Sequence, residues 1–281
     1  MNPAAVKALQ RRMEATGVTA PSTERLALVL YESNIDPAIF NDIDDKWLAR
    51  LANERVLPSV ERLSALSSTG RVEGLGEWMS FMAKKDSDAD VTRTVAELRE
   101  AERLLGEYPG DTISVGGDKR APPNPDNQAE TLASFDIGIK SPDGKILRSV
   151  DVTHADKPVK HISQLRPGVA HAAKKVKKRD AAGEPIPGKR DAIIRMELKP
   201  FRTEKEKGIE ELKADGTYMR ATRETPPREL ENTNIYDKFT DDLNGRPEES
   251  NVLDRVTLVD QNTGEGLAVY DRDGTTWTRT K

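Results

Sequence analysis

The order of apolar patterns between Asp88 and Leu198 is the feature that most limits the fold of this chain. Residues 88–105 have helical spacing, and the stretch PGDTISVGG that follows is typical of a short strand. Two more strand patterns, TLASFDIGIK and ILRSVDVTH, flank a turn with a glycine, and a helical segment precedes the apolar run DAIIRMEL. The order α, β, β, β, α, β predicts an α/β (α+β) fold with a mixed central sheet and flanking helices.

Three regions are expected along the 281 residues. Residues 1–87 have helical spacing and predict an all-helical region. Residues 88–200 contain the mixed pattern described above. Residues 201–281 form a charged segment, expected to be mostly helix or loop to about Glu249, and end in strand alternation broken by NTGEG and DRDG, which predicts a small β-meander.

The composition excludes several kinds of site. The chain has no cysteine, so disulfides, thiolate zinc sites, iron–sulfur clusters and cysteine nucleophiles are excluded, and any metal would be bound mainly by oxygen. No apolar run approaches the roughly 20 residues that cross a bilayer, and the first residues lack the pattern of a signal peptide. We therefore expect no membrane-spanning segment and no signal peptide in this chain.

Charge is distributed unevenly along the chain. Residues 157–190 contain ten Lys or Arg and two acids, although the whole chain has a net charge of -4, and residues 203–254 contain fourteen acids and eight bases. A basic block of this kind predicts a surface that contacts phosphate, and its alternative is a solvated helix face. The residues expected to bind nucleic acid are Lys174, Lys175, Lys177, Lys178, Arg179 and His154.

Two aspartates interrupt apolar strand patterns. Asp136 lies within SFDIGI and Asp151 within RSVDVT. A carboxylate in an apolar strand is unfavourable unless it has a partner or a solvated face, and alternation toward water is the simpler explanation. Two such residues on neighbouring strands suggest a shared ligand, since carboxylate oxygens bind Mg²⁺ and a bound cation promotes phosphodiester cleavage.

The element order with an acid in the first helix and in the second and third strands resembles the PD-(D/E)xK nuclease family. The resemblance implies a restriction-endonuclease-like core in which Glu97, Asp136 and Asp151 bind Mg²⁺, or Mn²⁺ or Zn²⁺, and contribute to phosphodiester hydrolysis. A helical wheel of the first helix places Glu97 at the border of its apolar face, with Glu102 on that face and Glu100 opposite. Glu102 and Glu100 therefore remain alternatives to Glu97.

The lysine of the family's motif is missing from its usual position. Two residues after Asp151 the chain has Thr153, so either the basic group comes from elsewhere or the domain is not a working nuclease. Lys174 and Lys175, on the helix that follows, are the expected catalytic lysines, and Lys140 and Lys157 are alternatives. A competing alignment places the (D/E)xK sequence itself at Glu197 to Lys199, at the end of the predicted strand DAIIRMEL.

The stretches ELREAERLL, RSVDVTHADK and GVAHAAKKVKKR resemble the C-terminal toxin regions of bacterial polymorphic toxins, including those of contact-dependent growth inhibition systems. This resemblance covers residues 88–198. It implies an endonuclease for tRNA or DNA that is secreted or delivered as part of a larger toxin, acts in the cytoplasm of the target cell, and is neutralised by an immunity protein.

Three other functions remain open. His154, His161 and His171 lie within eighteen residues, and a histidine pair could cleave RNA without a metal, one as base and one as acid. The same scaffold could bind nucleic acid without cleaving it, which would explain the missing lysine. The acidic C-terminal part could instead engage a basic protein partner.

Overall fold

The chain folds into two compact units. The computed structural model describes residues 3–32, 44–53, 55–82, 87–116, 135–155, 157–176, 187–205, 208–222, 224 and 229–281. The first unit comprises residues 1–149 and 180–182, and the second comprises residues 150–179 and 183–281. Strand β4 (Ile146–His154) contributes its first four residues to the first unit and the rest to the second.

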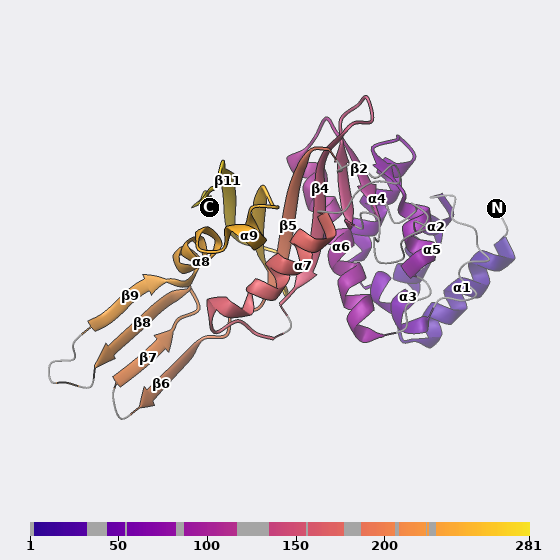
Figure 1. The fold of residues 1–281 in the computed structure, drawn as a ribbon. Coiled ribbons are helices and arrows are strands. Elements are labelled where there is room, and N and C mark those ends of the chain that lie inside the picture. The colour runs from indigo at the N-terminus through magenta and orange to yellow at the C-terminus, as the bar shows by residue number, and fades with distance from the viewer. Residues whose placement is uncertain are drawn as a thin grey trace, which may run out of the picture. The chain divides into compact units, whose positions relative to one another are not determined.

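Helices form most of the first unit (Figure 1). They are α1 (Pro3–Ala15), α2 (Ala20–Glu32), α3 (Asp45–Leu51), α4 (Leu57–Ser67), α5 (Leu75–Met82) and α6 (Asp88–Glu107). The apolar positions of α3 and α4 that repeat three and four apart are buried, among them Trp47, Leu51, Val60 and Leu63. The predicted helical region is confirmed, with the two-residue strand β1 (Val72–Glu73) as an addition.

Short strands complete the first unit. Strand β1 pairs in parallel with β2 (Thr112–Val115), and β2 pairs antiparallel with β3 (Ile137–Lys140). After β3 the chain turns back at Gly144, which has a φ of 83°, while the backbone N–H of Ser141 donates to the carbonyl of Lys145 at 2.9 Å. A positive φ is accessible to glycine at little cost, which is why the predicted turn has a glycine there.

The second unit contains the other strands of the central sheet. Strand β5 (Lys189–Met196) pairs in parallel with β10 (Arg255–Asp260), which continues antiparallel into β11 (Gly266–Asp273) and β12 (Thr276–Arg279). The full order is β1-β2-β3-β4-β5-β10-β11-β12, so the expected mixed central sheet is confirmed. The predicted meander is also confirmed, and its first strand extends the central sheet.

The helices of the second unit pack on and beside these strands. A short 3-10 turn η2 (Ile162–Gln164) precedes α7 (Arg166–Val176), which packs on β5 (Figure 1). Helix α8 (Ile235–Asn244) contacts β12 and η2, and α9 (Pro247–Ser250) contacts α7. No helix in the described parts of the chain is long and apolar enough to cross a membrane.

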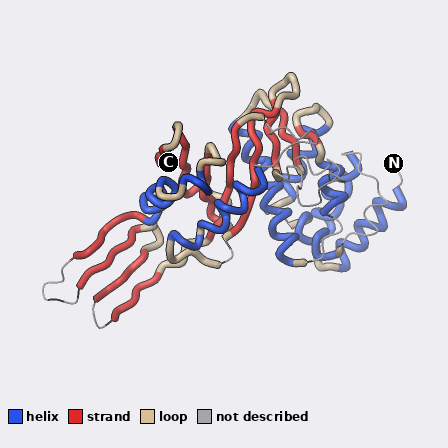
Figure 2. Tube along the Cα trace, viewed as in Figure 1, coloured by secondary structure: helices blue, strands red, loops and turns tan. Residues whose placement is uncertain are grey.

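A second sheet occupies the segment that was expected to be helix or loop. Strands β6 (Phe201–Lys205), β7 (Gly208–Leu212), β8 (Thr217–Thr222) and β9 (Glu229–Asn234) form a four-stranded antiparallel sheet (Figure 2). The prediction for this segment was wrong because most side chains of β7 and β8 are only half-buried, so charged residues occupy positions on both faces. The apolar alternation that marks a strand in sequence is therefore absent.

Candidate functional site: a buried aspartate paired with a helix lysine

Asp151 and Lys175 form an ion pair within the second unit. Asp151 lies in β4 and has no exposed surface, and the Nζ of Lys175 on α7 is 2.8 Å from its Oδ1. The Lys175 side chain keeps 24% of its surface exposed, whereas the Asp151 side chain keeps none. A buried carboxylate is costly unless it has such a charged partner.

Small residues let α7 come close enough to the sheet to make this pair. The buried face of the helix consists of Gly168, Val169, Ala172, Ala173 and Val176. A Cβ atom at Gly168 would lie 3.3 Å from Cγ2 of Ile194 and 3.4 Å from Cγ2 of Thr153. Lys175 follows Gly168 by seven residues, or about two helical turns, so it lies on the same side of the helix.

The same packing limits the side chain at position 153. Thr153 follows Asp151 by two residues and therefore lies on the same face of β4, the face that α7 covers. A lysine at position 153 would extend into the space that Gly168 and its neighbours occupy. The ammonium group beside Asp151 comes from the helix instead.

The other candidate lysines lie elsewhere. Lys174 and Lys157 are exposed, and Lys140 pairs with Glu73 of the first unit at 2.7 Å. Of the residues in the competing alignment, Glu197 accepts a hydrogen bond from Gln261 at 3.2 Å and Lys199 is exposed. Three predicted nucleic-acid contacts, Lys177, Lys178 and Arg179, lie outside the described residues.

The two other predicted metal ligands belong to the first unit. Glu97 of α6 is buried and accepts a hydrogen bond at 2.8 Å from the indole Nε1 of Trp78 on α5. Asp136 is also buried and directly precedes β3, where its carbonyl accepts from the backbone N–H of Gly116 at 2.8 Å. The described residues contain no group of three or more Asp, Glu or His side chains arranged to hold a metal ion.

The wheel of α6 misplaced the alternative glutamates. Glu100, expected on the solvent side, is 1% exposed and pairs with Arg103 at 2.8 Å, whereas Glu102 is half-exposed and pairs with Arg62 at 2.7 Å. Helix α6 contacts α3, α4 and β2, so more than one of its sides is covered. A single apolar stripe therefore does not identify all of its buried residues.

The three histidines lie on separate elements. His154 is the last residue of β4 and is half-buried, His161 precedes η2, and His171 is on the exposed face of α7. Because α7 begins at Arg166, His161 and His171 do not share a continuous helix. The contact of His154 with nucleic acid stays a prediction.

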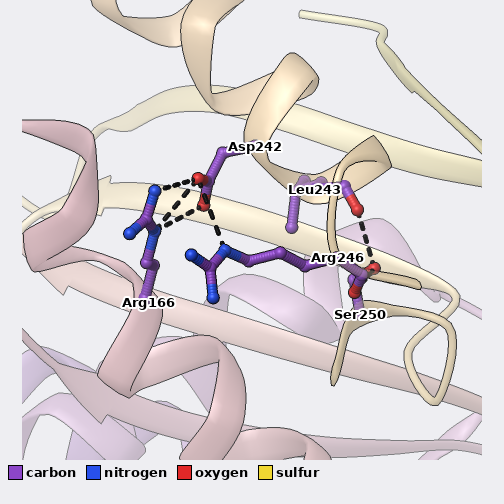
Figure 3. A network of polar contacts seen from close by, with 5 residues as sticks. All are labelled: Arg166, Asp242, Leu243, Arg246 and Ser250. Carbon is purple, nitrogen blue, oxygen red and sulfur yellow. Dashed lines mark hydrogen bonds and ion pairs between the residues drawn. The ribbon is translucent and has the colours of Figure 1, made fainter. Parts of the chain in front are cut away.

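A polar network that sequence reasoning missed holds the first residue of α7 (Figure 3). The guanidinium of Arg166 donates to Asp242 of α8 through Nε at 3.0 Å and Nη2 at 2.5 Å. Nε of Arg246 lies 3.8 Å from the same carboxylate, and the hydroxyl of Ser250 donates to the carbonyls of Leu243 and Arg246. Asp242 is 76 residues from Arg166 in an acidic stretch, so no local pattern identifies it as a partner.

Comparison with known proteins does not assign a family. No protein-family model matches the chain, and searches of curated proteins and of solved structures find no significant match. The fold defines the class as a mixed α/β protein with a large central sheet. A functional assignment therefore depends on the residues of the site.

Proposed function

We propose that this chain is a metal-dependent endonuclease that hydrolyses phosphodiester bonds of DNA or tRNA. The observation that carries the proposal is the 2.8 Å contact between Lys175 and the buried carboxylate of Asp151. In this proposal Lys175, on the helix that follows, takes the place of the lysine that the nuclease motif would have at position 153. The resemblance of the surrounding sequence to PD-(D/E)xK nucleases supports the same function.

Each charged group has a role in this proposal. The ammonium group of Lys175 binds a phosphate oxygen and stabilises the negative charge that develops during cleavage. The carboxylate oxygens of Asp151 suit a hard cation such as Mg²⁺, or Mn²⁺ or Zn²⁺. A bound cation would act as a Lewis acid on the phosphate and lower the pKa of the attacking water. Lys174, His154 and the Lys177 to Arg179 stretch contact the nucleic-acid backbone.

The biological setting follows from the resemblance to polymorphic toxins. We propose that the chain acts in the cytoplasm of a target cell after secretion or delivery as part of a larger toxin. A cognate immunity protein would neutralise it in the producing cell. Coexpression with the neighbouring open reading frame tests this setting, since an immunity protein should restore growth of cells that express the chain.

A second candidate function is nucleic-acid binding without cleavage. The observation that favours it is the ion pair itself, because the charge of Asp151 already has a partner in Lys175 at 2.8 Å. In that case the Lys175–Asp151 pair only joins α7 to β4. The two functions differ in one measurable outcome, which is cleavage.

The deciding experiment incubates the purified chain with plasmid DNA and with tRNA, in EDTA and after addition of Mg²⁺, Mn²⁺ or Zn²⁺. We expect cleavage only with a metal. The variant Lys175→Met should lose about 100-fold or more in rate, the size expected for a group that acts on the reacting phosphate. The matched variant Lys174→Met removes the adjacent, exposed lysine and should lose only the smaller factor of one backbone contact.

Other outcomes contradict specific parts of the proposal. Cleavage that persists in EDTA excludes the metal and favours the histidines. If Lys175→Met cleaves at the wild-type rate, Lys175 does not take part in the reaction. Binding that weakens with salt, in the absence of any cleavage, supports the non-catalytic function. A thermal melt of each variant determines whether it is folded at the assay temperature, so that a loss of rate caused by unfolding is recognised.

A further inference from the structure

Two aromatic rings meet at the surface of the second unit, outside the residues assigned above. The ring centroids of His161 and Phe201 are 5.8 Å apart, and their planes are inclined by 58°. The separation lies in the range of attractive aromatic pairs. His161 is exposed and Phe201 is half-buried, so the pair keeps ring surface that solvent reaches.

Backbone hydrogen bonds join the two segments that carry the rings. Val159 pairs with Leu198, with the Val159 N–H donating to the carbonyl of Glu197 at 2.7 Å and the Lys199 N–H donating to the carbonyl of Val159 at 2.9 Å. These bonds join the segment before His161 to the segment before Phe201. They fix the spacing of the two backbone segments that carry the rings.

Gln164 adds a second restraint on the histidine. Its Oε1 accepts from the backbone N–H groups of Lys160 at 2.7 Å and of His161 at 3.0 Å, and its Nε2 donates to the carbonyl of Pro158 at 3.3 Å. On the other side, Phe201 is the cross-strand partner of Leu212, which is buried. An aromatic surface that is already ordered loses little entropy when a flat ligand stacks on it.

The segments that carry this aromatic pair also carry basic residues. The exposed cations of the same two segments are Lys157, Lys160, Lys199 and Arg202. Residues 157–176 contain no acid, and the nearest exposed carboxylate on β6, that of Glu204, lies 3.5 Å from Arg202. Aromatic rings interleaved with cations bind single-stranded nucleic acid, because the rings stack on bases and the cations contact phosphates.

We propose that His161 and Phe201 form a stacking subsite for an unpaired nucleotide of the substrate. In a duplex the faces of the bases are covered by their neighbours and only their edges are accessible in the grooves, so these rings can act only on an unstacked base. This inference rests on the proposed function, and it narrows the substrate to single strands, loops or bulges.

The subsite lies beyond the start of the helix that carries the catalytic lysine. Lys175 follows Arg166 by nine residues, which is about 13 Å along the axis of α7, and His161 precedes Arg166 by five residues. The subsite therefore binds a nucleotide away from the ion pair. Its effect is on substrate choice and affinity, and it can be measured without cleavage.

The test measures binding by fluorescence anisotropy, with the full chain in EDTA. The labelled probes are oligo(dT), oligo(U), a duplex and an abasic strand, each of about 12 nucleotides. His161→Ala should weaken binding of the two single strands by roughly ten-fold, the size of one lost stack, and change binding of the duplex and the abasic strand by less than about two-fold. His161→Phe should restore the wild-type affinity, because it keeps an aromatic face.

His171→Ala is the matched control, because it removes an exposed histidine of the same basic region. It should leave the ratio of single-strand to duplex affinity unchanged, since a backbone contact affects both probes alike. The dT and U probes distinguish DNA from RNA as the source of the nucleotide.

The opposing results are distinct from failure of the proposed function. An equal loss on abasic and normal strands, an unchanged ratio in His161→Ala, or no binding of single strands by the wild type overturns the stacking subsite. The nuclease proposal is tested separately by cleavage. If the chain shows the predicted binding pattern but does not cleave, the stacking subsite is supported and the nuclease proposal is contradicted.

Discussion

Thr153 of β4 faces Gly168 of α7, so closely that a Cβ added at Gly168 would lie 3.4 Å from Cγ2 of the threonine. The side chain at position 153 is thus limited by a helix that packs on it. The same close approach brings Lys175 to Asp151. The packing of α7 therefore limits the side chain at position 153 and also places Lys175 beside Asp151.

Gly168→Val should move α7 away from the sheet. The added side chain would enter the space of Ile194 and Thr153, and such overpacking costs about 1–3 kcal/mol. Urea unfolding should show this loss, and cleavage should fall because the Lys175–Asp151 distance changes. Gly106→Val is the control, since a Cβ at that helical position meets no atom within 4 Å. Equal effects of the two substitutions would contradict the close packing of α7.

The ion pair should separate stability from activity. Lys175→Met leaves the buried carboxylate of Asp151 without its ammonium partner, and breaking a buried pair in this way costs about 3–5 kcal/mol. The double variant Asp151→Leu and Lys175→Met should regain most of the free energy of unfolding, because two apolar side chains replace two charges. It should remain inactive, and a double variant that cleaves at the wild-type rate would show that the pair is only structural.

Asp242→Ala should loosen the start of α7. The carboxylate is 13% exposed and accepts charge-assisted hydrogen bonds from Arg166, which are stronger than those between neutral groups (Figure 3). We expect a loss of about 1.5–3 kcal/mol in urea unfolding and faster hydrogen exchange in α7. Asp241→Ala, which removes the exposed neighbour, should change stability by less than about 0.5 kcal/mol. Unchanged exchange in α7 would show that Arg166 does not hold the helix.

Tyr270 should make the fold sensitive to alkali. Burial raises the pKa of its phenol above the ordinary value of 10.0. The unfolded chain loses this proton near pH 10 and the folded chain keeps it, so the free energy of unfolding falls as the pH rises above about 10.

Tyr270→Phe isolates this contribution. At pH 8 the variant should be less stable by about 1 kcal/mol, because it lacks the buried hydrogen bond from the hydroxyl to the carbonyl of Tyr236 at 2.9 Å. At pH 11 the difference should shrink, since other ionising groups act alike in both proteins. Urea unfolding at the two pH values measures it, and a constant difference would show that the pKa of Tyr270 is not raised.

The element types in the central sheet were accessible from local pattern. The strands around Ile139 and Val152, the turn at Gly144 and the final meander were predicted, because apolar alternation and a glycine with positive φ leave local traces. The sheet β6–β9 was not predicted. Its residues are half-exposed on both faces, so burial imposed no alternation on them.

The site was partly accessible in the same way. Asp151 was conspicuous because a carboxylate in an apolar strand requires a partner or a solvated face, and the following helix was the first expected source of the lysine, with Lys140 and Lys157 as alternatives. The sequence could not distinguish Lys174 from Lys175, because it does not show which side of α7 faces β4. The burial of Glu100 required knowledge that α6 is covered on more than one side.

The sequence by itself determined the mixed α/β class, the position of Asp151 in a strand, the absence of thiolate chemistry and the basic character of residues 157–176. These properties depend on residues that are near one another along the chain. Tertiary structure alone decided that Lys175 meets Asp151, that Asp242 holds Arg166, and that His161 meets Phe201. The residues of the two ion pairs are 24 and 76 positions apart in the sequence, and the two rings are 40 positions apart. These contacts form because whole helices and strands pack together, and no local sequence pattern indicates that packing.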